Sequence, residues 1–232
     1  FPVIRSMGEI AGNMAVLEAG RYLADEQGRG MMLGGVAGIA PAEVVIIGAG
    51  TVAEFAARAA LGLGAIVKVF DNSTYKLRRL QNSLGQRVYT SVITPKVLAK
   101  ALRRADVSIG ALRATAGRTP CVVTDKMIQE MKEGAVIVDV SIDQGGCFET
   151  SRVTTLENPT YTEYGVVHYC VPNIASGVPR TASFALSNIF APLILDIGEG
   201  GGMEKIIHDN AGFRHGVYMY KGTLTSSYLG ET

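Results

Sequence analysis

Two glycines follow an apolar run early in the chain, in the segment VVIIGAGTVA at Val44–Ala53. Gly48 permits a tight turn, and Gly50 lets the main chain approach a pyrophosphate without an intervening Cβ. Ala53 stands where a third glycine often occurs, and its methyl group still allows a helix to pack closely on a strand. A helix beginning here would present free N–H groups and its positive dipole end to a phosphate. The segment therefore predicts a phosphate-binding turn.

A carboxylate closes the next apolar run. Residues 65–70 are typical of a strand, and they end at Asp71, where a carboxylate can accept both hydroxyls of an adenosine ribose. The same charge would repel a 2′-phosphate, which favours NAD over NADP. Lys76, Arg78 and Arg79 lie nearby; they either weaken that preference or form a solvated helix face. Strand, turn, helix, second strand and acid together predict a dinucleotide site.

Asp143 is a second acid placed for chemistry. It follows the apolar run 135–140 and adjoins Gly145 and Gly146, which would let a substrate or cofactor approach closely. A carboxylate there could steady a developing iminium or hold a water for carbinolamine formation. Alternatively, it could cap the turn through the amides of Gly145 or Gly146. The spacing leaves both interpretations open.

Other polar residues lie near the same predicted strand ends. Asn173 could bind a carboxamide or a substrate carboxylate, or it could support a turn. His168 lies within an apolar strand and is expected to be a core or edge histidine. Cys147 and Cys170 fit the role of small apolar filler as well as that of reactive thiols, and Arg180 is expected to be structural. The sequence contains no catalytic triad, metal-ligand cluster or Walker pattern.

Strands and helices alternate along the chain in a way that would position these residues. An amphipathic helix is expected over residues 6–27, followed by a glycine-rich connection. The expected strands are residues 44–47, 65–70, 88–92, 105–111, 135–140 and 166–171. The expected helices are residues 53–64, 74–84 and 95–104 and a short one capped by Asp125. This alternation predicts an α/β, doubly wound parallel sheet (a Rossmann fold), which binds its ligand at the carboxyl ends of the strands.

Three segments follow from this pattern. Residues 1–40 form a connector helix and a glycine-rich lead-in, residues 41–178 a dinucleotide-binding Rossmann domain, and residues 179–232 a return helix and C-terminal segment expected to belong to the catalytic domain. The helix over residues 182–198 is strongly apolar, and we expect Pro192 to break it and GEGGG to end it. The two long helices are expected to lead to a second domain that is absent from this chain. Because the chain opens at Phe1, we expect a fragment of a larger polypeptide.

Composition narrows the functional classes. Of the 232 residues, 47% are hydrophobic and 19% charged, as in ordinary α/β proteins, and the net charge of +1 gives no indication of a nucleic-acid partner. No uninterrupted apolar run has membrane-spanning length and no secretory signal is visible, so no membrane partner is expected. Three cysteines, an odd number without metal spacing, favour a reduced, cytoplasmic protein. The apolar helix over residues 182–195 predicts association beyond the monomer.

Four segments resemble alanine dehydrogenases. They are SIDQGGCFETSR (Ser141–Arg152), HYCVPN (His168–Asn173), VPRTASFALSN (Val178–Asn188) and RSMGEIAG (Arg5–Gly12). The last is similar to the helix that joins the two domains in that family. The resemblance covers nearly the whole chain. The wider family includes the nucleotide-binding subunit of proton-translocating transhydrogenase, which shares that helix and the glycine turn.

The resemblance implies the reversible oxidative deamination of L-alanine to pyruvate and ammonium, with NAD as hydride acceptor, in a homohexamer. It places Asp143 on the family's catalytic aspartate. It places cofactor contacts, beside Gly48 and Gly50, on Ser6, Thr51, Val52, Asp71, Lys76, Leu112, Val140, Ser141, Ile142, Arg152, Val171, Pro172, Asn173 and Ile174. Leu112-Arg113 and Pro172 depart from the residues usual at these positions in the family.

The family's substrate-binding arginine and lysine and its catalytic histidine lie outside this chain. None of His168, His208 and His215 matches that histidine. The chain is therefore expected to supply the NAD site and one catalytic acid, to be inactive alone, and to leave amino-acid specificity undefined. Two alternatives remain: a transhydrogenase subunit, which needs no amino-acid site, and a non-catalytic NAD-binding module.

Overall fold

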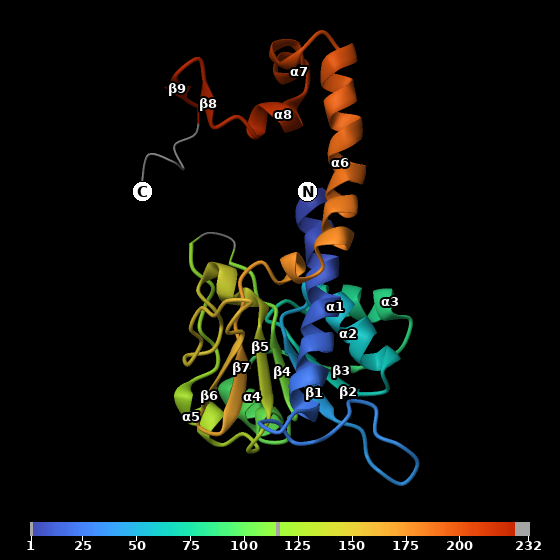
Figure 1. Ribbon diagram of the computed structural model, residues 1–232, viewed down its shortest axis with the longest axis vertical. Helices are drawn as coiled ribbons and strands as arrows, with labels where there is room; N and C mark the ends of the chain where they lie inside the picture. The colour runs from blue at the N-terminus through green and yellow to red at the C-terminus, as the bar shows by residue number, and fades with distance from the viewer. Residues whose placement is uncertain (1, 115–116, 226–232) are drawn as a thin grey trace. The chain divides into compact units, whose positions relative to one another are not determined.

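The computed structural model describes residues 2–114 and 117–225 (Figure 1). The chain divides into two compact units, Phe1–Ala182 and Ser183–Thr232. The first unit holds the predicted nucleotide-binding fold together with helix α1 (Pro2–Ala24), which packs along helix α2 (Thr51–Gly62). The connector helix is thus part of the same compact unit as the sheet.

In the described part of the chain, seven strands form one sheet in the order β3-β2-β1-β4-β5-β7-β6. The strands are β1 (Glu43–Ile47), β2 (Ile66–Phe70), β3 (Tyr89–Ser91), β4 (Val107–Gly110), β5 (Val136–Asp139), β6 (Thr160–Glu163) and β7 (Val166–Tyr169). All neighbours are parallel except β6 and β7. The strand order reverses between β1 and β4, which makes this the switch point of a doubly wound sheet. The predicted fold class is confirmed.

The antiparallel edge strand β6 was not predicted. Its sequence, TYTE, has no apolar run, and none of its residues is fully buried. A two-residue turn, Tyr164 and Gly165, both at positive φ, returns the chain into β7. Turns of this conformation suit the twist of antiparallel hairpins. Because an edge strand needs only one partner and one covered face, its sequence carries little hydrophobic signal.

Local signals set the ends of most helices. Helix α3 (Thr74–Leu84) has the bounds predicted; the Ser73 side chain accepts from the Lys76 amide, and Gly85 ends the helix in a left-handed conformation. Helix α4 (Pro95–Leu102) begins at its proline. The prediction for Asp125 was wrong, because Thr124 is the N-cap of α5 (Asp125–Gln129) and Asp125 is already helical.

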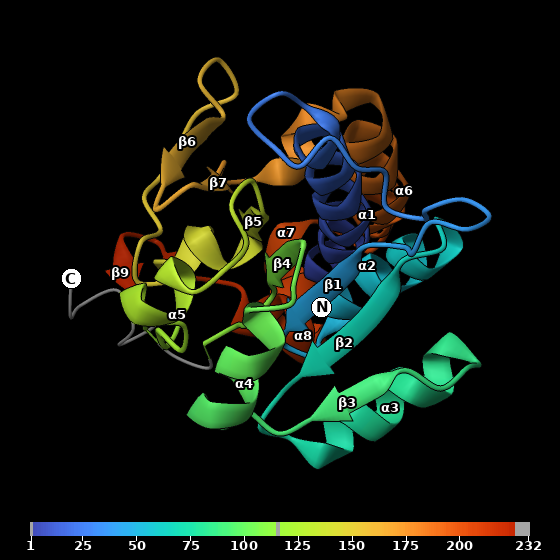
Figure 2. The ribbon, with the colours of Figure 1, turned by 90° about the horizontal axis from the view of Figure 1, so that it is seen from below.

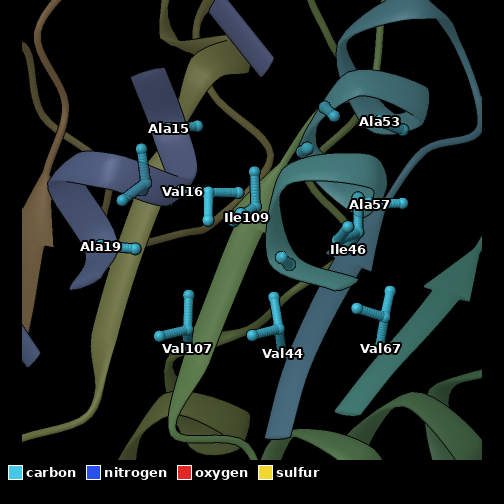
Figure 3. Close-up of a cluster of buried hydrophobic side chains, with 14 of the residues drawn as sticks. Ala15, Val16, Ala19, Val44, Ile46, Ala53, Ala57, Val67, Val107 and Ile109 are labelled. Atoms are coloured by element: carbon cyan, nitrogen blue, oxygen red, sulfur yellow. The ribbon is translucent and has the colours of Figure 1, made fainter. Parts of the chain in front are cut away.

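Apolar side chains alternate between the two faces of the sheet. Val44 and Ile46 belong to a core cluster shared with α1, α2 and α3, whereas Val45 and Ile47 belong to a second cluster shared with α4 and α5. Figure 2 shows α1 and α2 on one side of the sheet and α4 on the other. Figure 3 shows the first cluster, where strand valines and isoleucines lie beneath the alanines of α1 and α2. Small side chains on these helices allow close packing on the sheet.

Helix α6 (Pro179–Glu199) runs on from the first unit. The predicted break at Pro192 is wrong, since α6 is continuous over 21 residues. One proline removes a single helical N–H donor, and the hydrogen bonds on either side maintain the helix. By length and composition alone, α6 could cross a membrane. A single such helix is weak evidence for a membrane span.

The second unit continues with short elements that were not predicted. They are α7 (Met203–Asp209), α8 (Ala211–His215) and a hairpin of β8 (Met219–Tyr220) and β9 (Thr223–Leu224). Asn210 caps α8, its side chain accepting from the amides of Gly212 and Phe213. Helices of five to seven residues have too few turns for a periodic pattern to identify them.

Candidate functional site

The glycine turn after β1 packs closely against the end of β4. Gly48 has φ +119°, and a Cβ on it would lie 2.4 Å from the carbonyl oxygen of Ala111. The Gly48 amide donates to Phe70 O at 2.6 Å, and the Ala111 amide donates to Ile47 O at 2.8 Å. A Cβ on Gly50, by contrast, would have no described heavy atom within 4 Å. The turn is therefore fixed on its sheet side and open at Gly50.

Helix α2 begins in this turn without a side-chain cap. Gly50 is its N-cap, and no side chain in the described part of the chain caps the first amides, those of Thr51 and Val52. These N–H groups and the aligned peptide dipoles give the helix end a positive partial charge. An open approach at Gly50 and unsatisfied donors together fit the pyrophosphate of a dinucleotide.

Asp71 forms hydrogen bonds with both the glycine turn and the residue that precedes helix α3. It is 5% exposed; one carboxylate oxygen accepts from the Ala49 amide at 2.8 Å and the other from the Ser73 amide at 2.7 Å. Each oxygen has a second lone pair, so the carboxylate retains acceptor capacity for ribose hydroxyls. Lys76 lies exposed in the first turn of α3. Asp71 thus both shapes the turn and fits the ribose site.

The segment after β5 forms a short 3-10 helix, η1 (Val140–Gln144), which carries Asp143. The amides of Gly145 and Gly146 donate to the carbonyls of Ile142 and Ser141, at 2.9 and 3.0 Å. The turn-capping interpretation of Asp143 is therefore wrong, because backbone oxygens already satisfy these amides. The exposed Asp143 carboxylate instead accepts from the Asn173 amide at 2.9 Å. The ends of β5 and β7 are joined at this acid.

Asn173 supplies that amide from a special backbone position. Its φ of 52° is left-handed, a conformation that asparagine tolerates, and it precedes the 3-10 helix η2 (Ile174–Gly177). Val171 and Ile174 are buried in the core, whereas the Asn173 side chain is exposed and Pro172 is half-buried. Within 171–174, the exposed polar side chain is therefore that of Asn173.

Gln144 links the segments after β4 and β5. Its side-chain oxygen accepts from the Ala114 amide at 3.2 Å, and its carbonyl accepts from the Thr119 amide at 2.8 Å. The Arg118 guanidinium donates to the Gly145 carbonyl at 3.3 Å. Leu112, a predicted cofactor contact, is partly buried against the second core cluster. The carboxyl ends of β1, β4, β5 and β7 thus form one connected edge.

Arg152 lies beside the edge strand β6. Its guanidinium is 3.9 Å from the ring centroid of Tyr161, and its backbone amide donates to the Tyr161 hydroxyl at 3.0 Å. The Arg152 side chain is 62% exposed and approaches Glu163 at 4.0 Å. Its predicted cofactor contact stays a prediction.

The structure supports the expectation that His168 is a core histidine. The ring is fully buried; Nδ1 lies 2.9 Å from the Val166 carbonyl oxygen and Nε2 lies 2.7 Å from Thr150 Oγ1. Because a carbonyl only accepts, Nδ1 carries the proton and Nε2 accepts from the hydroxyl. Burial lowers the pKa of His168, which keeps the ring neutral.

Two glycines of α1 face helix α2. Gly8 and Gly12 face α2: a Cβ on Gly8 would lie 3.5 Å from Thr51 Cβ, and one on Gly12 would lie 2.4 Å from Val52 O. Ser6 is half-buried on the same helix, and its predicted cofactor contact stays a prediction. The signal missed in the sequence is this pair of glycines, spaced one helical turn apart.

The buried cysteines behave as packing residues. Cys147 and Cys170 are buried free thiols. Burial raises the pKa of Cys147 and raises that of Cys170 to about 11, so both remain protonated at neutral pH. Among the residues that the structure describes, no cluster of three His, Cys, Asp or Glu side chains could hold a metal ion.

Residues 15–227 match the family described as Alanine dehydrogenase/PNT, C-terminal domain. The chain belongs to this family. The alanine dehydrogenase of Mycolicibacterium smegmatis is 41% identical over 233 residues, which cover 100% of this chain and 62% of that protein. The chain thus spans about three fifths of the length of the curated relatives it matches.

Solved structures agree with this membership. An L-alanine dehydrogenase superposes with a TM-score of 0.94 at 37% identity, covering 99% of this chain and 63% of that one. A transhydrogenase from Sinorhizobium meliloti superposes with a TM-score of 0.70 at 23% identity over 84% of this chain and 56% of its own. At that identity the second likeness shows the shared fold alone.

Proposed function

We propose that this chain is the NAD-binding part of an alanine dehydrogenase, which oxidatively deaminates L-alanine to pyruvate and ammonium and catalyses the reverse reaction. The observation that carries the proposal is the pairing of Asp143 with the Asn173 amide. It places an exposed carboxylate at the same sheet edge as the open glycine turn. The alanine dehydrogenases at about 40% identity support the choice of substrate.

The proposed NAD site follows that edge. The amides of Thr51 and Val52 bind the pyrophosphate beside Gly50, and Asp71 binds the adenosine ribose and disfavours a 2′-phosphate. When bound, NAD supplies the hydride acceptor. The further proposed contacts are Ser6, Gly48, Lys76, Leu112, Val140, Ser141, Ile142, Arg152, Val171, Pro172, Asn173 and Ile174.

Asp143 is the proposed catalytic acid. Removal of hydride from the substrate Cα converts the amine into an iminium, and its positive charge is stabilised by an adjacent carboxylate. Asp143 then holds the water that adds to the iminium carbon before ammonium leaves. The Asn173 amide fixes the carboxylate during these steps. The arginine, lysine and histidine that the family resemblance implies for substrate binding and proton transfer would come from outside this chain.

We also propose a cytoplasmic homohexamer without a nucleic-acid or membrane partner. Four large apolar side chains of α6 are exposed in this chain: Phe184, Phe190, Ile194 and Leu195. Such a patch favours association with another protein surface. A transhydrogenase subunit and a non-catalytic NAD-binding module are the alternatives, and neither needs Asp143 to support reaction with alanine.

NADH formation from L-alanine and NAD tests the proposal. The assay uses the full-length protein, that is, this chain with the N-terminal region that its relatives carry. Asp143→Ala should lower kcat by about 10²-fold or more, in the range of lost acid–base groups. Glu133→Gln, at an exposed acid that precedes β5 and so lies at the amino end of the strands, is the matched control. Tight NADH binding without alanine turnover in the wild type would overturn the assignment, as would full activity of Asp143→Ala.

A further inference from the structure

Asp139 is a buried carboxylate that has no assigned role in the proposed reaction. It is the last residue of β5, 1% exposed, and no ion pair reaches it within residues 2–114 and 117–225. Burying a carboxylate without a cation is costly unless hydrogen bonds satisfy it. Its hydrogen-bond partners therefore indicate what it stabilises.

Four donors surround the carboxylate, and they span the segment that carries Asp143. Oδ1 accepts from the Ser141 amide at 3.0 Å and from Cys147 Sγ at 3.9 Å; Oδ2 accepts from the Cys147 amide at 2.9 Å and from Ser151 Oγ at 2.6 Å. Loop 140–147 is thus hydrogen-bonded near both of its ends to one carboxylate at the end of β5. Asp143 lies between the Ser141 and Cys147 amides, which donate to this carboxylate.

Two glycines give the carboxylate the space it occupies. A Cβ on Gly110 would lie 2.5 Å from Asp139 Oδ1, and a Cβ on Gly146 would lie 2.7 Å from Oδ2. Gly146 also has φ +78°, which disfavours other residues. The chain therefore admits no larger residue at either position while the carboxylate keeps this place. Burial raises the pKa of Asp139, and its hydrogen-bond donors oppose that rise by favouring the charged form.

We propose that Asp139 is a positioning residue: its carboxylate holds loop 140–147 so that Asp143 and the backbone of Val140–Ile142 keep their places at the cofactor edge. The proposal deepens, and rests on, the function proposed above. A catalytic group displaced by about 1 Å can lose about 10²-fold in rate, so an anchor this close to Asp143 affects catalysis directly.

Asp139→Asn in the full-length protein is the principal test. A carboxamide keeps the size of the carboxylate but turns an N–H₂ group toward either the Ser141 amide or the Cys147 amide, so one of these two hydrogen bonds is lost. We expect kcat to fall about 10²-fold and the NADH dissociation constant to rise about tenfold, measured by NADH fluorescence on protein that circular dichroism shows to be folded.

Asp106→Asn is the matched control. Asp106 is 3% exposed and accepts from the Glu43 amide at 2.9 Å and from Lys132 Nζ at 2.7 Å, but it precedes β4 and so lies at the opposite end of the sheet. This variant should lower thermal stability while kcat and the NADH dissociation constant of the folded protein stay within about twofold. Equal losses in both variants would overturn the proposal, as would an Asp139→Asn enzyme within about twofold of wild type in both quantities.

Neighbouring hydroxyls provide a second pair should Asp139→Asn not fold. Ser151→Ala removes one donor from Asp139, and Thr150→Ala removes the hydroxyl bound to His168 instead. The expected result is a severalfold lower kcat in Ser151→Ala alone, and equal kcat in the two variants would contradict the positioning role. If the wild type does not oxidise alanine, the proposed function fails, and the NADH dissociation constants still decide whether Asp139 positions the loop.

Discussion

Replacing Gly48 with alanine should lower the free energy of unfolding, because the turn has no room for the added methyl group. Its φ of +119° is rarely adopted by residues with a Cβ, and such a conformation costs about 1–3 kcal/mol. The new Cβ would also lie 2.4 Å from Ala111 O and 2.6 Å from Ala111 C. Because these are backbone atoms of the sheet edge, relief requires a backbone shift, which typically costs about 1–3 kcal/mol.

These two effects predict a loss of at least about 2 kcal/mol in the free energy of unfolding. Each kcal/mol corresponds to roughly 2–4 °C in Tm for 150–250 residues and to less in the longer full-length protein. Thermal unfolding of the full-length Gly48→Ala variant, followed by circular dichroism, should therefore show a Tm lower by at least about 2 °C.

Gly50→Ala is the matched variant in the same turn. Gly50 has φ −86°, and a Cβ there would meet no described heavy atom within 4 Å, so the free energy of unfolding should change by less than about 1 kcal/mol. Its methyl group would instead occupy the approach to the proposed pyrophosphate site. We expect NADH to bind at least about tenfold more weakly, a change of about 1.4 kcal/mol. An unchanged Tm in Gly48→Ala, or unchanged NADH affinity in Gly50→Ala, would refute this account of the turn.

Two further predictions concern the core. Because burial lowers the pKa of His168, the unfolded chain binds its proton first as pH falls below about 6.5, and stability declines there. Urea unfolding between pH 7 and 5 should therefore show a weaker pH dependence in His168→Gln than in the wild type, and equal slopes would contradict this. Gly12→Ala should cost about 1–3 kcal/mol, because its Cβ would lie 2.4 Å from Val52 O. A Cβ on Gly8 would lie 3.5 Å or more from its neighbours, so Gly8→Ala should be neutral or stabilising by up to about 1 kcal/mol. An equal loss of stability in both variants would show that contact distance does not decide the effect.

Elements with strong local signals could be predicted from the sequence. Apolar runs predicted the six parallel strands, and Ser73 and Gly85 fixed the ends of α3. The glycine turn and Asp71 likewise depend on residues close in sequence, and the structure places them together as expected. The family resemblance directed attention to Asp143, whose role the spacing left open.

Features that depend on distant residues could not be predicted. The edge strand β6 has no apolar pattern of its own and forms because β7 offers a partner. The continuity of α6 through Pro192 depends on hydrogen bonds along the whole helix. The close approach of Gly12 to Val52 requires two helices that are separated by the glycine-rich connection.

The sequence by itself determined the βαβ pattern, the phosphate-binding turn and the acids that end the strands, because turn geometry, helix capping and hydrophobic periodicity act over a few residues. Only the tertiary structure decided what those acids contact. It joined Asp143 to Asn173 across 30 residues and surrounded Asp139 with donors from its own loop and Ser151. Hydrogen bonds of this kind form only after the sheet brings strand ends together, so their partners cannot be assigned from sequence spacing.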